Sequence, residues 1–316
     1  MSPSLTIRRE SWPLEKPFAI SRGVKTAAEV IVVEASEDGF TGRGECVPYA
    51  RYGETPDSVE AQLRQAAAPD DLPPGAARNA LDCALWDLRA RRSGVPVWQS
   101  AGLSAPRAAI TAYTISLGTP DEMRAAAAEA AARPLLKVKL GEADPVGCIV
   151  AVRQGAPKAR LIADANEAWT IGQFAAVVDE LAELGVELIE QPLRAGDDEG
   201  LAGWRPPLLV CADESFHTAA DIPGLAGRYG AVNIKLDKAG GFTEALACLE
   251  AARAAKLKVM VGCMVATSLA MAPAALLAGA ADYVDLDGPL LLKTDRPGGL
   301  RFEGSLMFPP DPAFWG

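Results

Sequence analysis

Three acidic residues end short apolar runs in the second half of the 316-residue chain: Asp164 in LIAD, Glu190 in ELIE and Asp213 in LLVCAD. If these runs are adjacent parallel strands, about 4.8 Å apart, their three carboxylates converge on one point. Oxygen ligands suit a hard cation, so we predict a site for one Mg²⁺ ion per subunit, with Mn²⁺ as an alternative. For each acid taken alone, the competing interpretation is a helix cap or a lysine partner.

Lysines accompany these acids. Lys137 and Lys139 share one face of the run LLKVKL, because alternate residues of a strand point the same way. Lys235 lies in the run VNIKL, with the three acids on the runs between. Lysines on opposite sides of a metal site can move a proton from one face of a carbon to the other. Each must be neutral to act as a base, so we expect a lowered lysine pKa. Lys238 is expected to contribute charge only. The alternative is that these lysines are plain salt-bridge partners.

The elements that would carry these residues recur regularly. Eight short β-type runs start roughly 21 to 26 residues apart, with helix-forming stretches between several of them. They cover residues 110–116, 135–140, 161–164, 187–190, 208–213, 232–236, 258–263 and 283–287. This alternation predicts an α/β fold, a (β/α)7β TIM-like barrel whose chemistry lies at the carboxyl ends of the strands. A doubly wound sheet is the alternative.

The ends of the chain do not keep this spacing. Residues 29–46 read as a hairpin around Glu37-Asp38-Gly39, and residues 76–91 read as a helix. We therefore expect an α+β domain over residues 1–105 and the barrel over residues 106–288. The Pro- and Gly-rich segment 289–316 is expected to return to the first domain.

Composition excludes several classes of partner. Asp and Glu outnumber Lys and Arg by 41 to 31, which argues against nucleic acid. The uncharged stretch 259–281 is interrupted by Gly262 and Pro273, so we expect a buried strand and helix rather than a membrane span. Six cysteines without a CxxC pair and a start without an apolar signal segment favour a reduced, cytoplasmic location. Homo-oligomerisation is left open.

Five segments, LLKVKLG, ADANEAW, IEQPL, ADES and NIKLDKAGG, resemble in order and spacing the signatures of the enolase superfamily, muconate lactonizing enzyme subgroup. The resemblance implies a barrel with an α+β capping domain and a Mg²⁺-assisted reaction through an enediolate. It implies that the acids are metal ligands and that Lys139 and Lys235 are acid/base residues. Lys137 would lie beside the substrate carboxylate, and Asn166 would support the metal ligands.

Two further segments resemble those of dipeptide epimerases. Asp285 and Asp287 in DLDG match a DxD motif that would hold the free amine of a dipeptide, although one of them could instead cap a helix. Cys263 and Met264 would line the pocket or simply pack in the core. The segment FAISRG resembles a mobile cap loop in which an arginine, here Arg22, meets the side-chain carboxylate of glutamate. The alternatives for Arg22 are a solvated surface residue, or Arg51 or Lys25 in the same role.

The sequence therefore predicts an isomerase that epimerises L-Ala-L-Glu-like dipeptides by two-base 1,1-proton transfer, with cell-wall peptide recycling implied by resemblance only. The alternatives within the subgroup are an N-acylamino acid racemase, an o-succinylbenzoate synthase or an epimerase of non-acidic dipeptides. A non-catalytic binding barrel and a metal-free Schiff-base aldolase are the alternatives from other classes.

Overall fold

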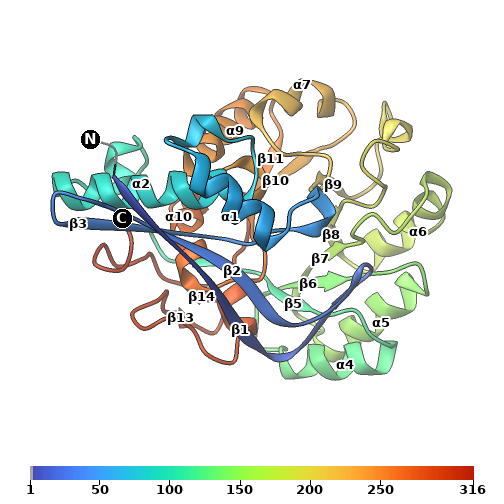
Figure 1. Ribbon diagram of the computed structural model, residues 1–316. Helices are drawn as coiled ribbons and strands as arrows, with labels where there is room; N and C mark the ends of the chain where they lie inside the picture. Colours follow the sequence, from blue (N-terminus) through green and yellow to red (C-terminus); the bar gives the residue numbers. More distant parts are fainter. Residues whose placement is uncertain (1–2) are drawn as a thin grey trace.

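The computed structural model describes residues 3–316, in which an N-terminal antiparallel sheet lies against a parallel barrel (Figure 1). The antiparallel sheet has the order β1 (Ser4–Ile20), β2 (Gly23–Glu37) and β3 (Phe40–Cys46). The β1–β2 hairpin extends past β3, and its tip reaches the barrel near the ends of β6 to β8 (Figure 1). The turn residues Ser21 and Arg22 both donate hydrogen bonds to the backbone oxygen of Asn166 there.

Helices α1 (Pro56–Gln65) and α2 (Ala76–Ser93) pack on this sheet and complete the cap. Apolar residues of β2, such as Ile31 and Val33, form a buried cluster with the two helices. Glycine is required where α2 crosses β3: a Cβ at Gly44 would lie 2.1 Å from the backbone oxygen of Ala80. The sheet and the helix therefore approach more closely than any larger residue allows.

The barrel strands are parallel and neighbour one another in chain order. They are β5 (Tyr113–Ile115), β6 (Leu135–Lys139), β7 (Arg160–Asp164), β8 (Val186–Glu190), β9 (Leu209–Ala212), β10 (Ala231–Ile234), β11 (Lys258–Gly262) and β12 (Tyr283–Asp285). A backbone hydrogen bond from Ala112 to Val284, 2.8 Å long, joins the first edge to the last. The predicted (β/α)7β TIM-like barrel with an α+β cap is confirmed.

Helices surround the barrel, and a threonine capping box starts two of these α-helices, α4 and α6. Thr119 and Thr170 each accept a hydrogen bond from the backbone three residues on, and the side chain there bonds back to the threonine backbone. The helices outside the first sheet are α3 (Val97–Ser100), α4 (Pro120–Glu129), α5 (Pro145–Gly155), α6 (Ile171–Glu183), α7 (Ile222–Leu225), α8 (Leu236–Ala239), α9 (Phe242–Ala254) and α10 (Ser268–Ala275).

The structure differs from expectation at the start of the barrel domain. The run 110–116 is divided: β4 (Ala109–Ile110) pairs with β14 (Leu306–Met307), which pairs with β13 (Phe302–Glu303). The C-terminal segment does return to the cap, since the Trp315 indole donates a 2.8 Å hydrogen bond to the backbone oxygen of Arg43. The uncharged stretch 259–281 contains β11 and α10, and no helix within residues 3–316 is long and apolar enough to cross a membrane.

Candidate active site

The three predicted metal ligands lie together at the carboxyl ends of adjacent barrel strands. Asp164 ends β7, Glu190 ends β8, and Asp213 directly follows β9. Asp164 and Glu190 are register partners in the sheet, so their side chains point to the same side. Each of the three residues is at most 2% exposed to solvent. Buried carboxylates of this kind need charged partners.

The predicted lysines are those partners. The Nζ atom of Lys137 lies 2.6 Å from Glu190 Oε2 and 3.2 Å from Asp164 Oδ2. Lys139 donates a 2.6 Å hydrogen bond to Asp164, and Lys235, directly after β10, donates a 2.7 Å bond to Asp213. Because β6 and β10 lie on opposite sides of β7 to β9, Lys139 and Lys235 flank the acids from two directions.

Nearby charges and burial have opposite effects on the pKa values of these side chains. Burial would lower the pKa of Lys235, but the carboxylates of Asp213 and Glu190 outweigh it and hold the pKa well above its ordinary value. These acids direct their negative charge at Lys235 and stabilise its ammonium form. Burial would likewise raise the pKa of Asp164, but Lys139 and Lys137 hold that pKa low.

More negative than positive groups gather at this end of the barrel. Four buried ammonium groups face six buried carboxylates; one of the six, Glu214, also pairs with the Arg22 guanidinium of the cap, so the formal charge of the group with that arginine is −1. The ammonium groups belong to Lys137, Lys139, Lys235 and Lys238, and the carboxylates to Asp164, Glu190, Asp213, Glu214, Asp285 and Asp287. Asp285 Oδ1 is buried and accepts no hydrogen bond, whereas Glu190 Oε2 has the Lys137 ammonium 2.6 Å away. As the side chains stand, no three acidic, histidine or cysteine residues within residues 3–316 are arranged to hold a metal ion. Lysine ammonium groups lie between the acids instead.

The DxD pair lies beside Lys137. Asp285 Oδ2 accepts a 2.8 Å hydrogen bond from Lys137, and Asp287 Oδ2 accepts a 2.7 Å bond from the backbone of Thr114. Burial, followed by the nearby Asp285 charge, raises the pKa of Asp287 to about 7. Asp287 also precedes a short 3₁₀ turn, Gly288–Leu291, but its side chain makes no capping hydrogen bond there.

The remaining predicted residues are two that follow β11 and one that contacts Asp213. Cys263, partly exposed, and Met264, 8% exposed, directly follow β11. Burial, and then the charges of Asp285 and Asp287, raise the pKa of the Cys263 thiol. Lys238 donates hydrogen bonds to both the carboxylate and the backbone oxygen of Asp213. It therefore pairs with the third acid rather than standing free.

Asn166 joins the acids to the cap. Its backbone N–H donates a 2.9 Å hydrogen bond to Asp164 Oδ1, and its backbone oxygen accepts the bonds from Ser21 and Arg22. Asn166 and Glu167 have φ values of 46° and 68°, an uncommon conformation for two consecutive non-glycine residues. Backbone strain of this kind is held in place by surrounding contacts. A shift of the cap hairpin would therefore displace Asn166 and alter the position of the Asp164 carboxylate.

Arg22, predicted to meet a substrate carboxylate, has two carboxylates of the protein as partners. Its guanidinium lies 2.7 Å from Glu214 Oε1 and 3.3 Å from Glu167 Oε2, and it donates a 3.1 Å bond to the Tyr49 hydroxyl. Arg51 donates two 2.7 Å bonds to the same Glu167 carboxylate. The sequence analysis assigned no role to Glu167 or Glu214, although Glu214 directly follows Asp213 and Glu167 lies three residues after Asp164.

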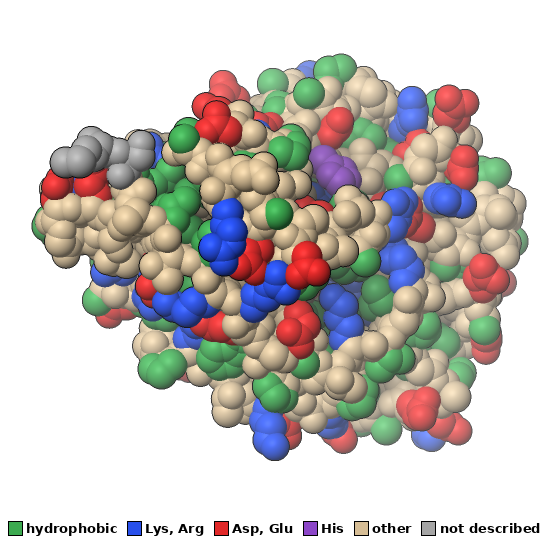
Figure 2. Space-filling model, in the orientation of Figure 1, with side chains coloured by type: hydrophobic (Ala, Val, Ile, Leu, Met, Phe, Trp, Pro, Cys, Tyr) green, Lys and Arg blue, Asp and Glu red, His purple; other side chains and the backbone are tan. Residues whose placement is uncertain are grey.

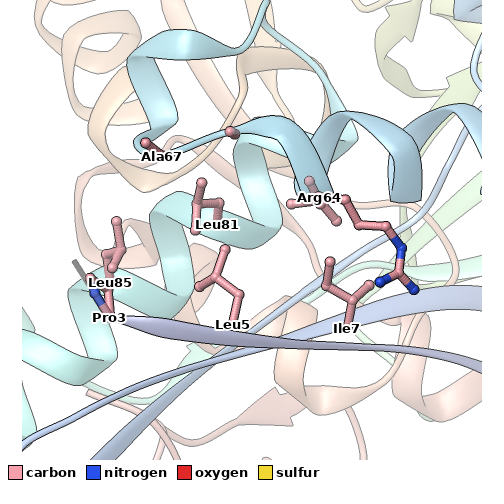
Figure 3. Close-up of a pocket in the computed structure, with 9 residues that line it drawn as sticks. Pro3, Leu5, Ile7, Arg64, Ala67, Leu81 and Leu85 are labelled. Carbon is pink, nitrogen blue, oxygen red and sulfur yellow. The ribbon is translucent and has the colours of Figure 1, made fainter.

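A cavity of about 730 Å³ opens where the hairpin tip meets the barrel loops. Its lining includes Arg22 and Arg51 from the cap and Glu142, Glu167 and Arg194 from the loops after β6, β7 and β8. Basic side chains gather on this face of the molecule (Figure 2). A second cavity, about 380 Å³, lies between β1 and the cap helices; its lining is apolar except for Arg64 (Figure 3).

Comparisons with known proteins agree with this architecture. Residues 3–73 and 53–102 match the mandelate racemase / muconate lactonizing enzyme N-terminal domain, and residues 122–311 match the enolase C-terminal domain-like family. L-Ala-D/L-Glu epimerase of Escherichia coli is 46% identical over 95% of this chain and 97% of its own. N-acetyl-D-glutamate racemase of a Pseudoalteromonas species is 43% identical over 91% and 95%.

Solved structures are similar over nearly the whole chain. An enolase family member from Agrobacterium tumefaciens, with homology to dipeptide epimerases and with bound sodium and L-Ala-L-Glu, is 48% identical. Its TM-score is 0.95, and the match covers 99% of both chains. The dipeptide epimerase of Enterococcus faecalis, complexed with Mg and L-Leu-L-Tyr, is 29% identical with a TM-score of 0.89, over 98% and 97%. The chain therefore belongs to the enolase superfamily, in its mandelate racemase / muconate lactonizing enzyme branch.

Proposed function

We propose that this protein is a metal-dependent dipeptide epimerase that inverts the α-carbon of the C-terminal residue of L-Ala-L-Glu-like dipeptides. The observation that carries the proposal is the placement of Lys139 and Lys235 on opposite sides of three buried carboxylates. The similarity to an Escherichia coli L-Ala-D/L-Glu epimerase, and to a structure with bound L-Ala-L-Glu, supports this choice of substrate.

The residues present fit a divalent cation. The buried carboxylates at this end of the barrel outnumber the cationic groups around them, and the acids at the ends of three adjacent strands supply oxygen ligands for a cation. Asp164, Glu190 and Asp213 would hold the ion once the lysine ammonium groups move aside, and the oxygen donors suit Mg²⁺, with Mn²⁺ as the alternative. The bound cation would stabilise the negative charge that develops on the substrate carboxylate when the α-proton leaves.

The two lysines would divide the proton transfer. One removes the α-proton from one face of the carbon as a neutral amine, and the other delivers a proton to the opposite face as an ammonium ion. The Phe18 ring of the cap lies 5.9 Å from Lys139 Nζ, and Lys235 is 6% exposed, so both lysines are screened from bulk water. Lys137, held between Glu190 and Asp285, would add positive charge beside the substrate carboxylate.

Other residues would recognise the ends of the dipeptide. Asp285 and Asp287 would pair with its free amine, Arg22 would contact its acidic side chain, and Cys263 and Met264 would line the pocket. Asn166 would position Asp164. Lys238 would hold Asp213 in the same way. An epimerase of this kind would act on peptides from cell-wall recycling in the cytoplasm, alone or as a homo-oligomer.

N-acetyl-glutamate racemisation is the second candidate, because a racemase of that substrate is 43% identical to this chain. The same lysines and acids would perform it. The buried pair Asp285 and Asp287 favours the dipeptide, because an N-acyl group brings no cation to balance two carboxylates.

Proton exchange distinguishes these functions. The wild-type protein is incubated with Mg²⁺ in D₂O with L-Ala-L-Glu, L-Ala-L-Leu or N-acetyl-L-glutamate, and the α-proton is followed by NMR. We expect loss of the glutamyl α-proton of L-Ala-L-Glu together with appearance of the L,D diastereomer. Exchange with L-Ala-L-Leu alone would remove the acidic preference, and exchange with N-acetyl-L-glutamate alone would favour the racemase.

A further inference from the structure

The positive charges of the two cap arginines at this cavity, Arg22 and Arg51, are already balanced by carboxylates of the protein. Arg22 and Arg51 lie within ion-pair distance of Glu167, and Arg22 also pairs with Glu214. These four side chains, which we term the mouth cluster, carry two positive and two negative formal charges. A side-chain carboxylate that enters beside them adds a charge to a neutral group. Burying that charge is costly unless another cation accompanies it.

Among the described residues that line the cavity, Arg194 is the cation available for this. It lines the same cavity as Arg22 and Arg51, in the loop after β8. Its side chain is exposed and forms no hydrogen bond or ion pair with any residue from 3 to 316. Among the charged residues that line this cavity, Glu142 is the other one without an ion pair in the described chain, and its negative charge excludes it from this role.

The backbone beside Arg194 is fixed to the mouth cluster. The N–H of Ala195 donates a 2.8 Å hydrogen bond to Glu167 Oε1, the same oxygen that Arg51 contacts. Arg194 therefore starts from a defined place at the edge of the cluster, although its own side chain is exposed. A guanidinium in this position can bind a carboxylate through two parallel hydrogen bonds.

We propose that Arg194 is a specificity-determining residue that supplies the positive charge for the side-chain carboxylate of the substrate. Arg22, held by Glu214 and Glu167, then orients that carboxylate but does not by itself balance its charge. This inference rests on the proposed epimerase function and assigns one part of its substrate pocket. It also implies that a basic side chain is disfavoured at the same place, because Arg194 repels it.

The test compares a charged substrate with an uncharged one of the same shape. Rates of epimerisation of L-Ala-L-Glu and L-Ala-L-Gln are measured for the wild-type protein, Arg194→Ala, Arg194→Lys and Arg205→Ala. Arg205 is the matched control, since it is an exposed arginine in the same β8–β9 connection but outside the cavity lining. We expect Arg194→Ala to lower kcat/KM for L-Ala-L-Glu about tenfold through a raised KM, the loss of roughly one charge-assisted hydrogen bond.

The other expected results follow from charge alone. Arg194→Ala should leave kcat/KM for L-Ala-L-Gln unchanged, Arg194→Lys should restore part of the preference for L-Ala-L-Glu, and Arg205→Ala should change neither substrate. Equal losses for both substrates in Arg194→Ala, or no loss for either, would overturn the inference alone. A wild-type protein without preference for L-Ala-L-Glu would overturn both this inference and the acidic substrate of the proposed function.

Discussion

Replacing Lys137 by Met removes one positive charge from the centre of the buried acids while keeping the length of the side chain. Lys137 Nζ lies within 3.2 Å of three carboxylates, those of Asp164, Glu190 and Asp285, and the residue is 2% exposed. The three acids together hold the pKa of Lys137 well above its ordinary value, against the effect of burial, which would lower it. The variant would leave these acids to repel one another.

Removing one partner of a buried ion pair typically lowers the free energy of unfolding by about 3–5 kcal/mol. With an unfolding entropy of about 2.1 cal/mol/K per residue, this 316-residue chain loses about 1.5 °C of Tm per kcal/mol, so Tm should fall by roughly 5–8 °C. Lys258→Met is the matched control, because Lys258 is exposed and pairs with Asp282 alone at 2.8 Å. An exposed pair contributes about 1 kcal/mol or less, so its loss should shift Tm little.

The assay is thermal unfolding of both variants in the presence of a chelator and then with added Mg²⁺. In Lys137→Met the freed acids should bind Mg²⁺ more tightly, and a concentration about 100 times Kd returns about 2.7 kcal/mol. The reasoning is refuted if Lys137→Met unfolds at the same temperature as Lys258→Met. It is also refuted if Mg²⁺ raises the Tm of Lys137→Met no more than it raises that of the control.

Three further predictions concern single side chains. Asp287→Asn should raise KM for L-Ala-L-Glu by about tenfold with a smaller change in kcat, because one carboxylate partner of the amine is lost; an unchanged KM in steady-state kinetics would contradict this. Burial raises the pKa of Asp237 to about 7, so the folded protein binds this proton more tightly than the unfolded chain does. As the pH rises from about 4 to 7, the free energy of unfolding therefore falls. Asp237→Asn should therefore gain stability over wild type across that range, by roughly 4 kcal/mol at most, and a constant difference in denaturant unfolding would disprove it. Gly44→Ala should lower the free energy of unfolding by about 2 kcal/mol or more, since its Cβ would meet the Ala80 oxygen at 2.1 Å, whereas Gly172→Ala, with open space around it, should not.

The barrel was predictable because its strands are buried on both faces. Each appears in the sequence as a short apolar run, and the interval between runs fits one strand and one helix. The long strand β1 was not predicted, for the opposite reason. It lies at a sheet edge, most of its residues are exposed or half-buried, and it contains Pro13 and Pro17, which are tolerated only at such edges. An edge strand of this kind has no apolar run to detect.

At the site, too, the residues placed by strand ends were predictable, and the contacts made by tertiary packing were not. Asp164, Glu190, Lys139 and Lys235 meet as predicted because each is tied to a strand end, so topology alone brings them together. The ion pairs of Arg22 were not predicted, because they join segments about 145 and 190 residues apart through the fit of the cap on the barrel. No spacing within one segment encodes such a contact, and the balanced charge of the mouth cluster became visible only in three dimensions.

The proposed epimerisation depends most directly on two lysines that act on opposite faces of one carbon. Lys139→Ala and Lys235→Ala are each incubated with Mg²⁺ in D₂O, separately with L-Ala-L-Glu and with L-Ala-D-Glu, and the glutamyl α-proton is followed by NMR. We predict that neither variant interconverts the diastereomers, and that each exchanges the α-proton of only one of them, the two variants exchanging opposite ones. Interconversion at the wild-type rate in both variants, or exchange of the same diastereomer by both, would contradict the two-base account.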